Sequence, residues 1–271
     1  MLLGYQQRTD KYCRVFYISG LLIINQLKMK NLFLLAISLF TISTFGQTKL
    51  YDNVFIKAEN IYAYDQFVKE HYAKIHNERV DKGMLLQWDV WKVIDTPQED
   101  FTHMVTYIYD IKKYPNQTPP YEMIGMSNLQ WATIQDEVNQ MRERVAQVKW
   151  IDLGSARKKG VDYLPEIMVL NMMKAQNGKA GSYEKEEIKR TKSISNNSNK
   201  AGWNFHRRIG EYGSDVYFTH ATIDWYDSYK DYLSGWFGEW SDSNGQGFNW
   251  DSLRELKKMV VMKKLISSKD K

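Results

Sequence analysis

The chain has 271 residues, of which 43% are hydrophobic and 14% aromatic, so it is too apolar for a disordered protein and long enough to bury a core. Its formal net charge is +5, but residues 1–46 hold five Lys or Arg and one Asp, and without that +4 the remainder stands at only +1. The basic character therefore belongs to the N-terminal segment, and the electrostatic argument for a nucleic-acid partner disappears.

The N-terminal segment predicts export. Lys28 and Lys30 precede an apolar run from Leu32 to Phe45, and the small residue Gly46 follows it. These are the three parts of a signal peptide. The run is about 14 residues long, whereas a membrane-spanning helix needs about 20, so we expect cleavage and no stable membrane anchor afterwards.

We therefore divide this segment into a non-native leader at 1–28 and a signal peptide at 29–46, with translation beginning at Met29. The mature protein is expected in the periplasm or outside the cell. The single cysteine, Cys13, lies before the expected cut, so the mature protein would contain no disulfide.

The elements predicted after residue 46 form one structural unit that occurs twice in the chain. The first copy reads as a strand at 54–60, a helix ending at Gly83, strands at 85–94 and 101–110, a helix over 126–148 and a strand at 148–154. The second copy reads as strands at 171–177, 203–209 and 218–227, with a polar helix after the first strand that frays through 193–199. Its end reads as a Gly- and Ser-rich loop near 241–247, a helix near 250–259 and a strand near 260–266.

The segments FTHMVTYIYD at 101–110 and FTHATIDWYD at 218–227 carry the duplication, at an offset of 117 residues. The fold class is α+β, with two tandem ferredoxin-like β-α-β-β-α-β units at 47–155 and 156–271. Each unit forms a four-stranded antiparallel sheet with both helices on one face. We expect the bare faces of the two sheets to pack against each other as an intrachain pseudo-dimer.

This element order, with the segments HYAKIHNERVDKG and FTH, resembles the dimeric α+β barrel group over roughly residues 51–154 and 165–267. The group includes antibiotic-biosynthesis monooxygenases, stress-responsive barrel proteins and NIPSNAP-type proteins. The resemblance implies small, often apolar ligands, and several members are cofactor-free oxygenases or haem proteins. No residue set here transfers one of those activities, and no cofactor is predicted.

His103 and His220 are the candidate catalytic residues, because an imidazole on a cavity wall can act as a general acid or base. Hairpins centred on Pro97 and Gly213 would place Trp91 opposite His103 and His206 opposite His220. The alternative is that both histidines fill the sheet interface with satisfied hydrogen bonds.

A candidate ligand pocket surrounds these histidines. Its members combine aromatic surface with a few polar groups, as small-molecule sites do, although they could equally be sheet-edge residues facing water. They are Asp89, Trp91, Tyr107, Asn204, His206, Arg208 and Asp224. A metal on His206 and His220 would lack an obvious third ligand, so no metal site is predicted.

The function expected from the sequence is small-molecule binding without turnover. The first alternative is a cofactor-independent oxygenase or isomerase that uses His103 or His220. The second is a glycan-binding or envelope-assembly role, suggested by the aromatic residues around the glycine-rich loop, which are Trp236, Phe237, Trp240, Phe248 and Trp250. The chain has no phosphate loop, nucleophile elbow or H-E-x-x-H motif.

Overall fold

The computed structural model describes residues 49–95, 97–98, 100–114, 120–190, 194–211, 213, 215–242 and 249–270. The predicted leader and signal peptide lie outside these residues. Residues 48–271 form one compact unit. Within the described ranges, no helix has both the length and the apolar character needed to cross a membrane.

The elements repeat in two halves. The first half contains β1 (Lys49–Ala58), α2 (Ile61–Phe67), the π turn η1 (Val68–Tyr72), α3 (Ala73–Asp81), β2 (Gln87–Val93), β3 (His103–Asp110), α4 (Pro120–Met123), α5 (Asn128–Met141) and β4 (Arg142–Arg157). The second half contains β5 (Ile167–Ala175), α6 (Ala180–Arg190), β6 (Gly202–Ile209), β7 (His220–Tyr226), α7 (Tyr229–Asp242), the 3-10 turn η2 (Trp250–Ser252) and β8 (Arg254–Ser267).

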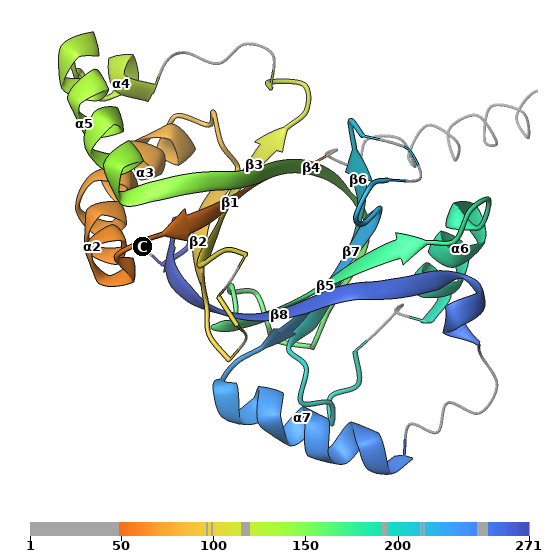
Figure 1. Cartoon of the computed structure of the whole chain (residues 1–271). Coiled ribbons are helices and arrows are strands. Elements are labelled where there is room, and N and C mark those ends of the chain that lie inside the picture. The colour runs from red at the N-terminus through yellow and green to blue at the C-terminus, as the bar shows by residue number, and fades with distance from the viewer. Residues whose placement is uncertain are drawn as a thin grey trace, which may run out of the picture. The chain divides into compact units, whose positions relative to one another are not determined.

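The eight strands close into one antiparallel barrel in the order β1-β3-β2-β8-β5-β7-β6-β4, and β4 pairs back with β1 (Figure 1). Each half contributes the strand order expected of a ferredoxin-like unit. The halves join edge to edge, through β2 with β8 and β4 with β6. The predicted α+β fold of two tandem ferredoxin-like units is confirmed, and the two joins leave no unpaired sheet edge.

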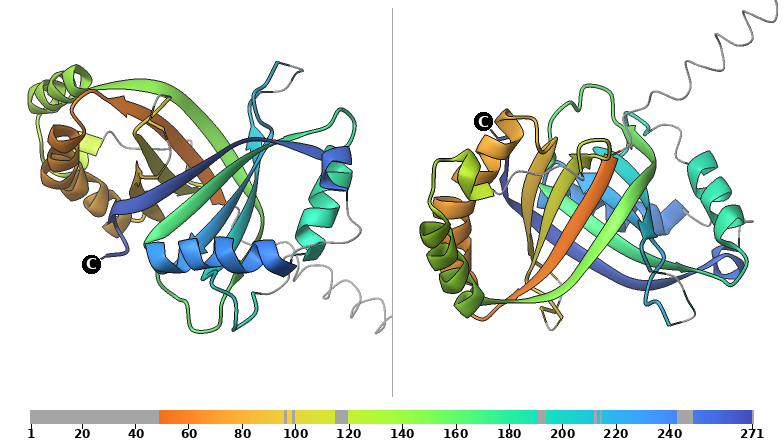
Figure 2. Two further views of the ribbon diagram at one scale, coloured as in Figure 1. Left: turned by 60° about the horizontal axis from the view of Figure 1, so that its bottom comes forward. Right: turned by 90° about the horizontal axis from the view of Figure 1, so that it is seen from above.

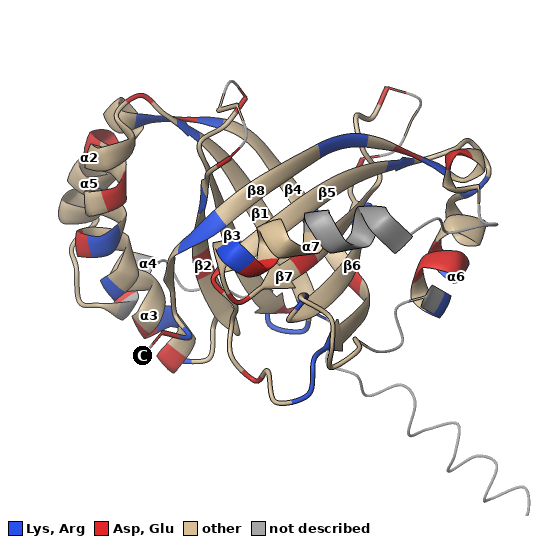
Figure 3. Cartoon of the chain, turned by 90° about the horizontal axis from the view of Figure 1, so that it is seen from below, with Lys and Arg blue, Asp and Glu red and all other residues tan. Residues whose placement is uncertain are grey.

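The helices cover the outside of the barrel. Helices α2, α3 and α5 lie over the first half and α6 and α7 over the second (Figures 1 and 2). Basic residues recur along β8, while the charged residues of α2 and α5 are all acidic and α6 carries both signs (Figure 3). Helix α2 begins at an Asn60 side chain that accepts a hydrogen bond from the Ala63 N–H. Helix α3 ends before Gly83, whose φ of +68° suits glycine.

The prediction for the second helix differs from the structure in each half. The helix predicted over 126–148 is too long, and the helix predicted near 250–259 does not form. Helix α5 ends at Met141, and the next seven residues, which the sequence analysis assigned to it, begin β4 instead. The helix predicted near 250–259 is only the turn η2, and β8 begins at Arg254. In both halves this stretch pairs with the first strand of its own copy, from Ala58 with Arg142 and from Ala175 with Arg254. Pairing in the sheet overrides the local helical preference.

The two hairpins differ by one residue from the predicted register. Trp91 pairs with Met104 and His206 with Ala221, so the hairpins are centred between residues 97 and 98 and between 213 and 214. A one-residue change moves each side chain to the opposite face of the sheet. Trp91 and His206 therefore face the barrel interior, whereas His103 and His220 face the helices.

His103 joins a helix to the outside of the barrel. Its Nδ1 lies 2.8 Å from Thr102 Oγ1, and its Nε2 lies 2.8 Å from Asp65 Oδ1 on α2. Lys92 Nζ donates to the other carboxylate oxygen of Asp65 at 2.7 Å. Burial raises the pKa of Asp65, but the hydrogen bonds from His103 and Lys92 outweigh it, and the net pKa is lowered. We call this arrangement the first helix clamp.

The second half repeats the clamp with different residues. His220 Nδ1 lies 2.9 Å from Thr219 Oγ1, and its Nε2 lies 3.0 Å from Glu184 Oε1 on α6. Arg207 Nη2 donates to Glu184 Oε2 at 2.6 Å. The two Phe-Thr-His segments thus have matching surroundings, which the predicted duplication requires. His103 and His220 therefore lie between the sheet and a helix with both ring nitrogens engaged, which is the structural alternative to a catalytic role.

Neutralising Asp65 tests the first clamp. Asp65→Asn keeps the shape but removes the negative charge facing Lys92, and we expect the free energy of unfolding to fall by about 1–2 kcal/mol in urea denaturation. Glu78→Gln is the control, since Glu78 forms an exposed ion pair with Lys82 on α3 and should cost at most about 0.5 kcal/mol. If Asp65→Asn and Glu78→Gln lower the free energy of unfolding by the same amount, the clamp contributes no more to stability than an exposed ion pair does.

Candidate functional site

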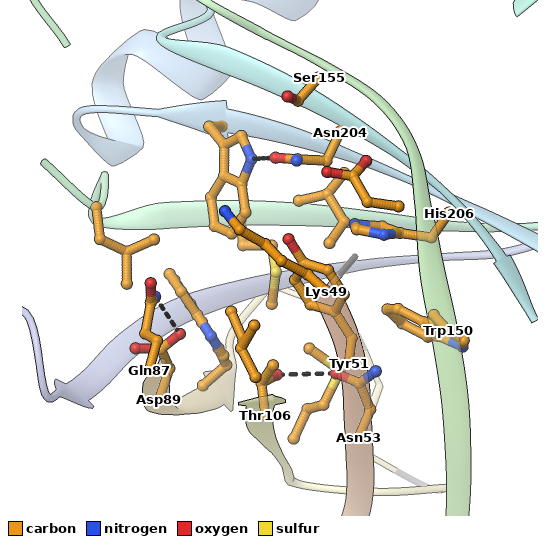
Figure 4. Close-up of a pocket in the computed structure, with 18 of the residues that line it drawn as sticks. Lys49, Tyr51, Asn53, Gln87, Asp89, Thr106, Trp150, Ser155, Asn204 and His206 are labelled. Carbon is orange, nitrogen blue, oxygen red and sulfur yellow. Dashed lines mark hydrogen bonds between the residues drawn. The ribbon is translucent and has the colours of Figure 1, made fainter. Parts of the chain in front are cut away.

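A cavity of about 260 Å³ lies inside one end of the barrel, enclosed by inward-facing side chains of both halves (Figure 4). Its aromatic lining residues are Tyr51, Trp91, Trp150, Trp225 and His206. Four of the residues predicted to bind a ligand line it, namely Asp89, Trp91, Asn204 and His206. Their role in binding stays a prediction, but the structure does bring them together.

The two copies have diverged inside this cavity. Tyr51 and Thr106 of the first copy occupy the register positions of Met168 and Ile223 in the second, and all four line the cavity. Strands β1, β2, β4 and β6 carry most of the polar lining, whereas β5 and β7 contribute only the apolar Met168, Ile223 and Trp225. A ligand with a polar group at each end matches this lining, because β2 and β6 carry polar side chains on opposite walls.

His206 is the least satisfied polar residue of the cavity. It is 1% exposed, and its ring lies between Tyr51 and Trp150, with centroid distances of 4.6 Å and 5.6 Å. Neither ring nitrogen makes a hydrogen bond of standard geometry in the described part of the chain, although the Ile151 backbone lies close enough to interact with the ring. Burial lowers the pKa of His206 to about 3, against a weaker opposing effect of the Ile151 backbone. A neutral imidazole offers one donor and one acceptor.

Asn204 lies beside His206 on β6 and is fixed by two donors. Its Oδ1 accepts from Trp225 Nε1 at 2.6 Å and from Arg157 Nη1 at 3.0 Å. The Arg157 guanidinium also lies 5.4 Å above the Trp225 ring. Burial lowers the pKa of Arg157. Arg157 was not predicted from the sequence, because it lies at an odd spacing from Trp150 and only the β-bulge between Asp152 and Gly154 returns it to the inner face of β4.

Asp89 lies on the opposite wall, because β2 and β6 occupy the third and seventh places in the ring of strands. It is 3% exposed and accepts hydrogen bonds from Ser267 Oγ at 2.5 Å and from Gln87 Nε2 at 2.6 Å. Burial raises its pKa to about 7, in spite of these hydrogen bonds. Near neutral pH Asp89 can therefore exist as an acid or as a base.

The other predicted site residues lie elsewhere, and the expectation that they share a cavity wall is wrong. His103 and His220 lie in the helix clamps outside the barrel. Tyr107 also faces outward, with its ring 5.1 Å from that of His76, and Asp224 pairs with Lys200 at 3.3 Å. The cause is the same strand alternation that reversed the histidines. Arg208 faces inward at the opposite end of the barrel.

The histidines and carboxylates described above do not form a ligand set suited to a metal ion or a haem. Among the described residues, no cluster of three His, Cys, Asp or Glu side chains could hold a metal ion. The proposed pairing of His206 with His220 does not form, because the two face opposite sides of the sheet. Both ring nitrogens of His103 and His220 are engaged, and His206 faces a cavity of about 260 Å³, which is small for a cofactor of haem size.

The aromatic cluster suggested for glycan binding falls largely outside the side chains that the structure describes. Only Trp250 can be placed, and its ring packs under the Arg254 guanidinium at 4.9 Å. The glycan hypothesis therefore stays a prediction from the sequence.

No protein-family profile and no curated protein matches this chain. Among solved structures, a monooxygenase candidate from Fusobacterium nucleatum is 13% identical with a TM-score of 0.54, and the match covers 83% of this chain and 95% of that one. A monooxygenase candidate from Lactobacillus acidophilus is 10% identical with a TM-score of 0.53, covering 81% and 95%. At these identities the likeness shows the fold alone, which is that of the dimeric α+β barrels.

The burial of His206 predicts a pH-dependent stability. Its pKa is about 3 when folded and about 6.5 when unfolded, so the unfolded chain binds more protons between these values. His206 therefore lowers stability as pH falls from about 6.5 toward 3, by up to about 1.4 kcal/mol per pH unit. The variant His206→Phe should lack this loss of stability at low pH. The difference between the free energies of unfolding of the wild type and of His206→Phe, measured against pH, should therefore fall from about pH 6.5 toward pH 3.

Subtraction is needed because Asp89, with a raised pKa, acts in the opposite direction over much of the same range and is present in both proteins. His71→Gln is the control, since His71 lies at the surface of the π turn against Phe67. If the difference in free energy of unfolding between the wild type and His206→Phe does not change with pH, His206 is not buried in the neutral state.

Proposed function

We propose that the barrel cavity reversibly binds a small planar aromatic molecule that carries a hydrogen-bonding group at each end. The observation that supports this most is the buried imidazole of His206 in an aromatic cavity, where neither ring nitrogen makes a hydrogen bond of standard geometry with the described residues. A buried polar group without a partner costs about 1–3 kcal/mol. A ligand that donates to or accepts from His206 would recover much of that free energy.

The lining suggests how such a molecule would lie. One polar end would meet His206 and Asn204, and the other would meet Asp89 across the barrel. The ring between them would contact Tyr51 of β1 (Figure 4) and Trp91 of β2, which both line the cavity. The volume of about 260 Å³ is just below the usual range for small-molecule sites, so we expect a ligand of one or two rings.

Binding of 4-hydroxyacetophenone tests this proposal, because that neutral molecule has a phenol and a carbonyl at opposite ends of one ring. We expect saturable quenching of tryptophan fluorescence, since three tryptophans line the cavity. His206→Phe should weaken binding about 10-fold by removing the polar contact. Ile223→Phe should do the same or more by filling the cavity.

Ile188→Phe is the matched control for the filled cavity, because Ile188 is 40% exposed on α6. It should leave the affinity within about 2-fold of the wild type, whereas binding that survives Ile223→Phe would show that the cavity is not the site. Urea denaturation of each variant confirms that the protein titrated is folded.

A second candidate function is cofactor-independent oxygenase or isomerase chemistry, which the pKa of Asp89 favours. A carboxylate with a pKa of about 7 can accept a proton from an acidic C–H or O–H bond of the bound ligand. In an isomerisation it would return that proton to another carbon, so that the reaction balances without a co-reactant. The role once assigned to His103 or His220 would then belong to Asp89.

Oxygen uptake with quinol-like substrates and proton exchange into deuterated 4-hydroxyacetophenone test this second candidate. We expect kcat/KM to rise through about pH 7 as Asp89 loses its proton. Asp89→Asn should lower the rate about 100-fold or more, and Asp136→Asn on the exposed surface of α5 should not. A pH-independent rate, or full activity in Asp89→Asn, would leave only the binding function.

A further inference from the structure

A second cavity opens at the opposite end of the barrel and shares no lining residue with the first. Its volume is about 480 Å³, within the range of small-molecule sites. The floor is apolar, formed by Phe55, Phe101, Val148, Met172 and Phe218. Apolar side chains of the barrel centre, including Leu170 and Val260, belong to the same buried cluster as this floor. We call this space the distal cavity.

Apolar side chains also reach solvent at the rim of the distal cavity. Val145 is 44% exposed and Tyr217 is 50% exposed, and both line it. Tyr217 is fixed there, because its hydroxyl donates to the Lys257 carbonyl at 3.0 Å. An apolar rim leading to an apolar floor is suited to the chain of an amphiphile.

Two cations lie at the wall of this cavity, and each rests on an aromatic floor residue. The Arg208 guanidinium lies 5.1 Å from the centroid of the Phe218 ring, and Lys258 Nζ lies 5.7 Å from that of Phe101. The side chains are only 14% and 22% exposed. Desolvation lowers the pKa of Arg208, as expected for a cation held in partly apolar surroundings.

The carboxylates that pair with these cations are held much less firmly. Arg208 pairs with Glu211 and Lys258 with Asp100, but the two carboxylate side chains are 56% and 63% exposed. Exposed ion pairs contribute little to stability, because solvent screens the charges and both side chains lose conformational freedom. A carboxylate carried by a ligand already bound through its chain can therefore replace Glu211 or Asp100 at little cost.

Both cations are departures from the internal symmetry of the barrel. By strand register, Arg208 occupies the place of Val93 in the first copy, because Lys92 pairs with His103 as Arg207 pairs with His220. Lys258 in turn corresponds to Ala146, since Met172 pairs with Lys258 as Phe55 pairs with Ala146. The positive charges of the distal cavity thus both come from the second half, on its two edge strands β6 and β8.

We propose that the distal cavity binds a linear monocarboxylate amphiphile. Its carboxylate lies against Arg208 and Lys258, and its hydrocarbon chain covers Phe55, Phe101 and Phe218. Charge complementarity selects an anionic head, and the apolar floor and rim select a chain. This site is independent of the function proposed for the first cavity.

Isothermal titration with decanoate tests this inference on the folded chain. We expect saturable binding of decanoate and at least about 10-fold weaker binding of decanol, which has the same chain without the charge. The double variant Arg208→Gln/Lys258→Gln should weaken decanoate about 10-fold and leave decanol unchanged. Lys263→Gln is the matched control, because Lys263 lies on the same strand in an exposed pair with Glu166.

The location of the site is tested separately. Ala146→Trp should block the distal cavity and abolish decanoate binding, whereas Ile223→Phe, which fills the first cavity, should leave it intact. The proposal would be overturned if decanoate does not bind or if decanol binds equally well. It would also be overturned if Ile223→Phe loses decanoate binding while Ala146→Trp keeps it. Sedimentation showing a concentration-dependent dimer that Val145→Asp disrupts would overturn it as well, because the face would then be covered by a second copy.

Discussion

The closure of the strand ring is the constraint on which the rest of the structure depends. Each four-stranded half has two free edges and a bare apolar face, and neither would be stable in water. The pairings of β2 with β8 and of β4 with β6 remove all four edges at once and enclose both faces. Eight strands leave an interior that side chains nearly fill, and among the described residues a cavity lies at each end of the barrel.

Within a closed barrel, strand alternation decides which residues face the interior. The sequence was sufficient to predict the duplication, the element order and the common face of Asp89, Trp91, Asn204 and His206, because alternation within one strand can be counted. It was not sufficient to relate one strand to the next. The loops that join β2 to β3 and β6 to β7 allowed hairpin centres half a residue apart, and the choice between them reverses the partner strand. His103 and His220 were misplaced for that reason.

The helix boundaries failed for a related reason. The segment from Arg142 to Val148 has good helix formers, and only its hydrogen bonds to β1 make it a strand. The equivalent stretch in the second half behaves alike against β5. Arg157 escaped notice because the predicted strand ended three residues before it. Long-range pairing thus decided both the boundaries and part of the candidate site.

The contrast between histidines is the clearest link between packing and function. His103 and His220 use both nitrogens to hold a helix on the barrel, and their duplication fits a structural role. His206 replaces Trp91 of the other copy, lies between Tyr51 and Trp150, and makes no hydrogen bond of standard geometry with the described residues. A buried group that is left unsatisfied in one copy only is better explained by a ligand than by stability.

The most direct measurement of this account is a crystal structure of the protein soaked with 4-hydroxyacetophenone. The account predicts electron density for the ring inside the barrel beside Trp91, with one polar end within hydrogen-bond distance of His206 and the other near Asp89. Density at the outer helices or in the distal cavity alone, with His206 still unpartnered, would contradict it.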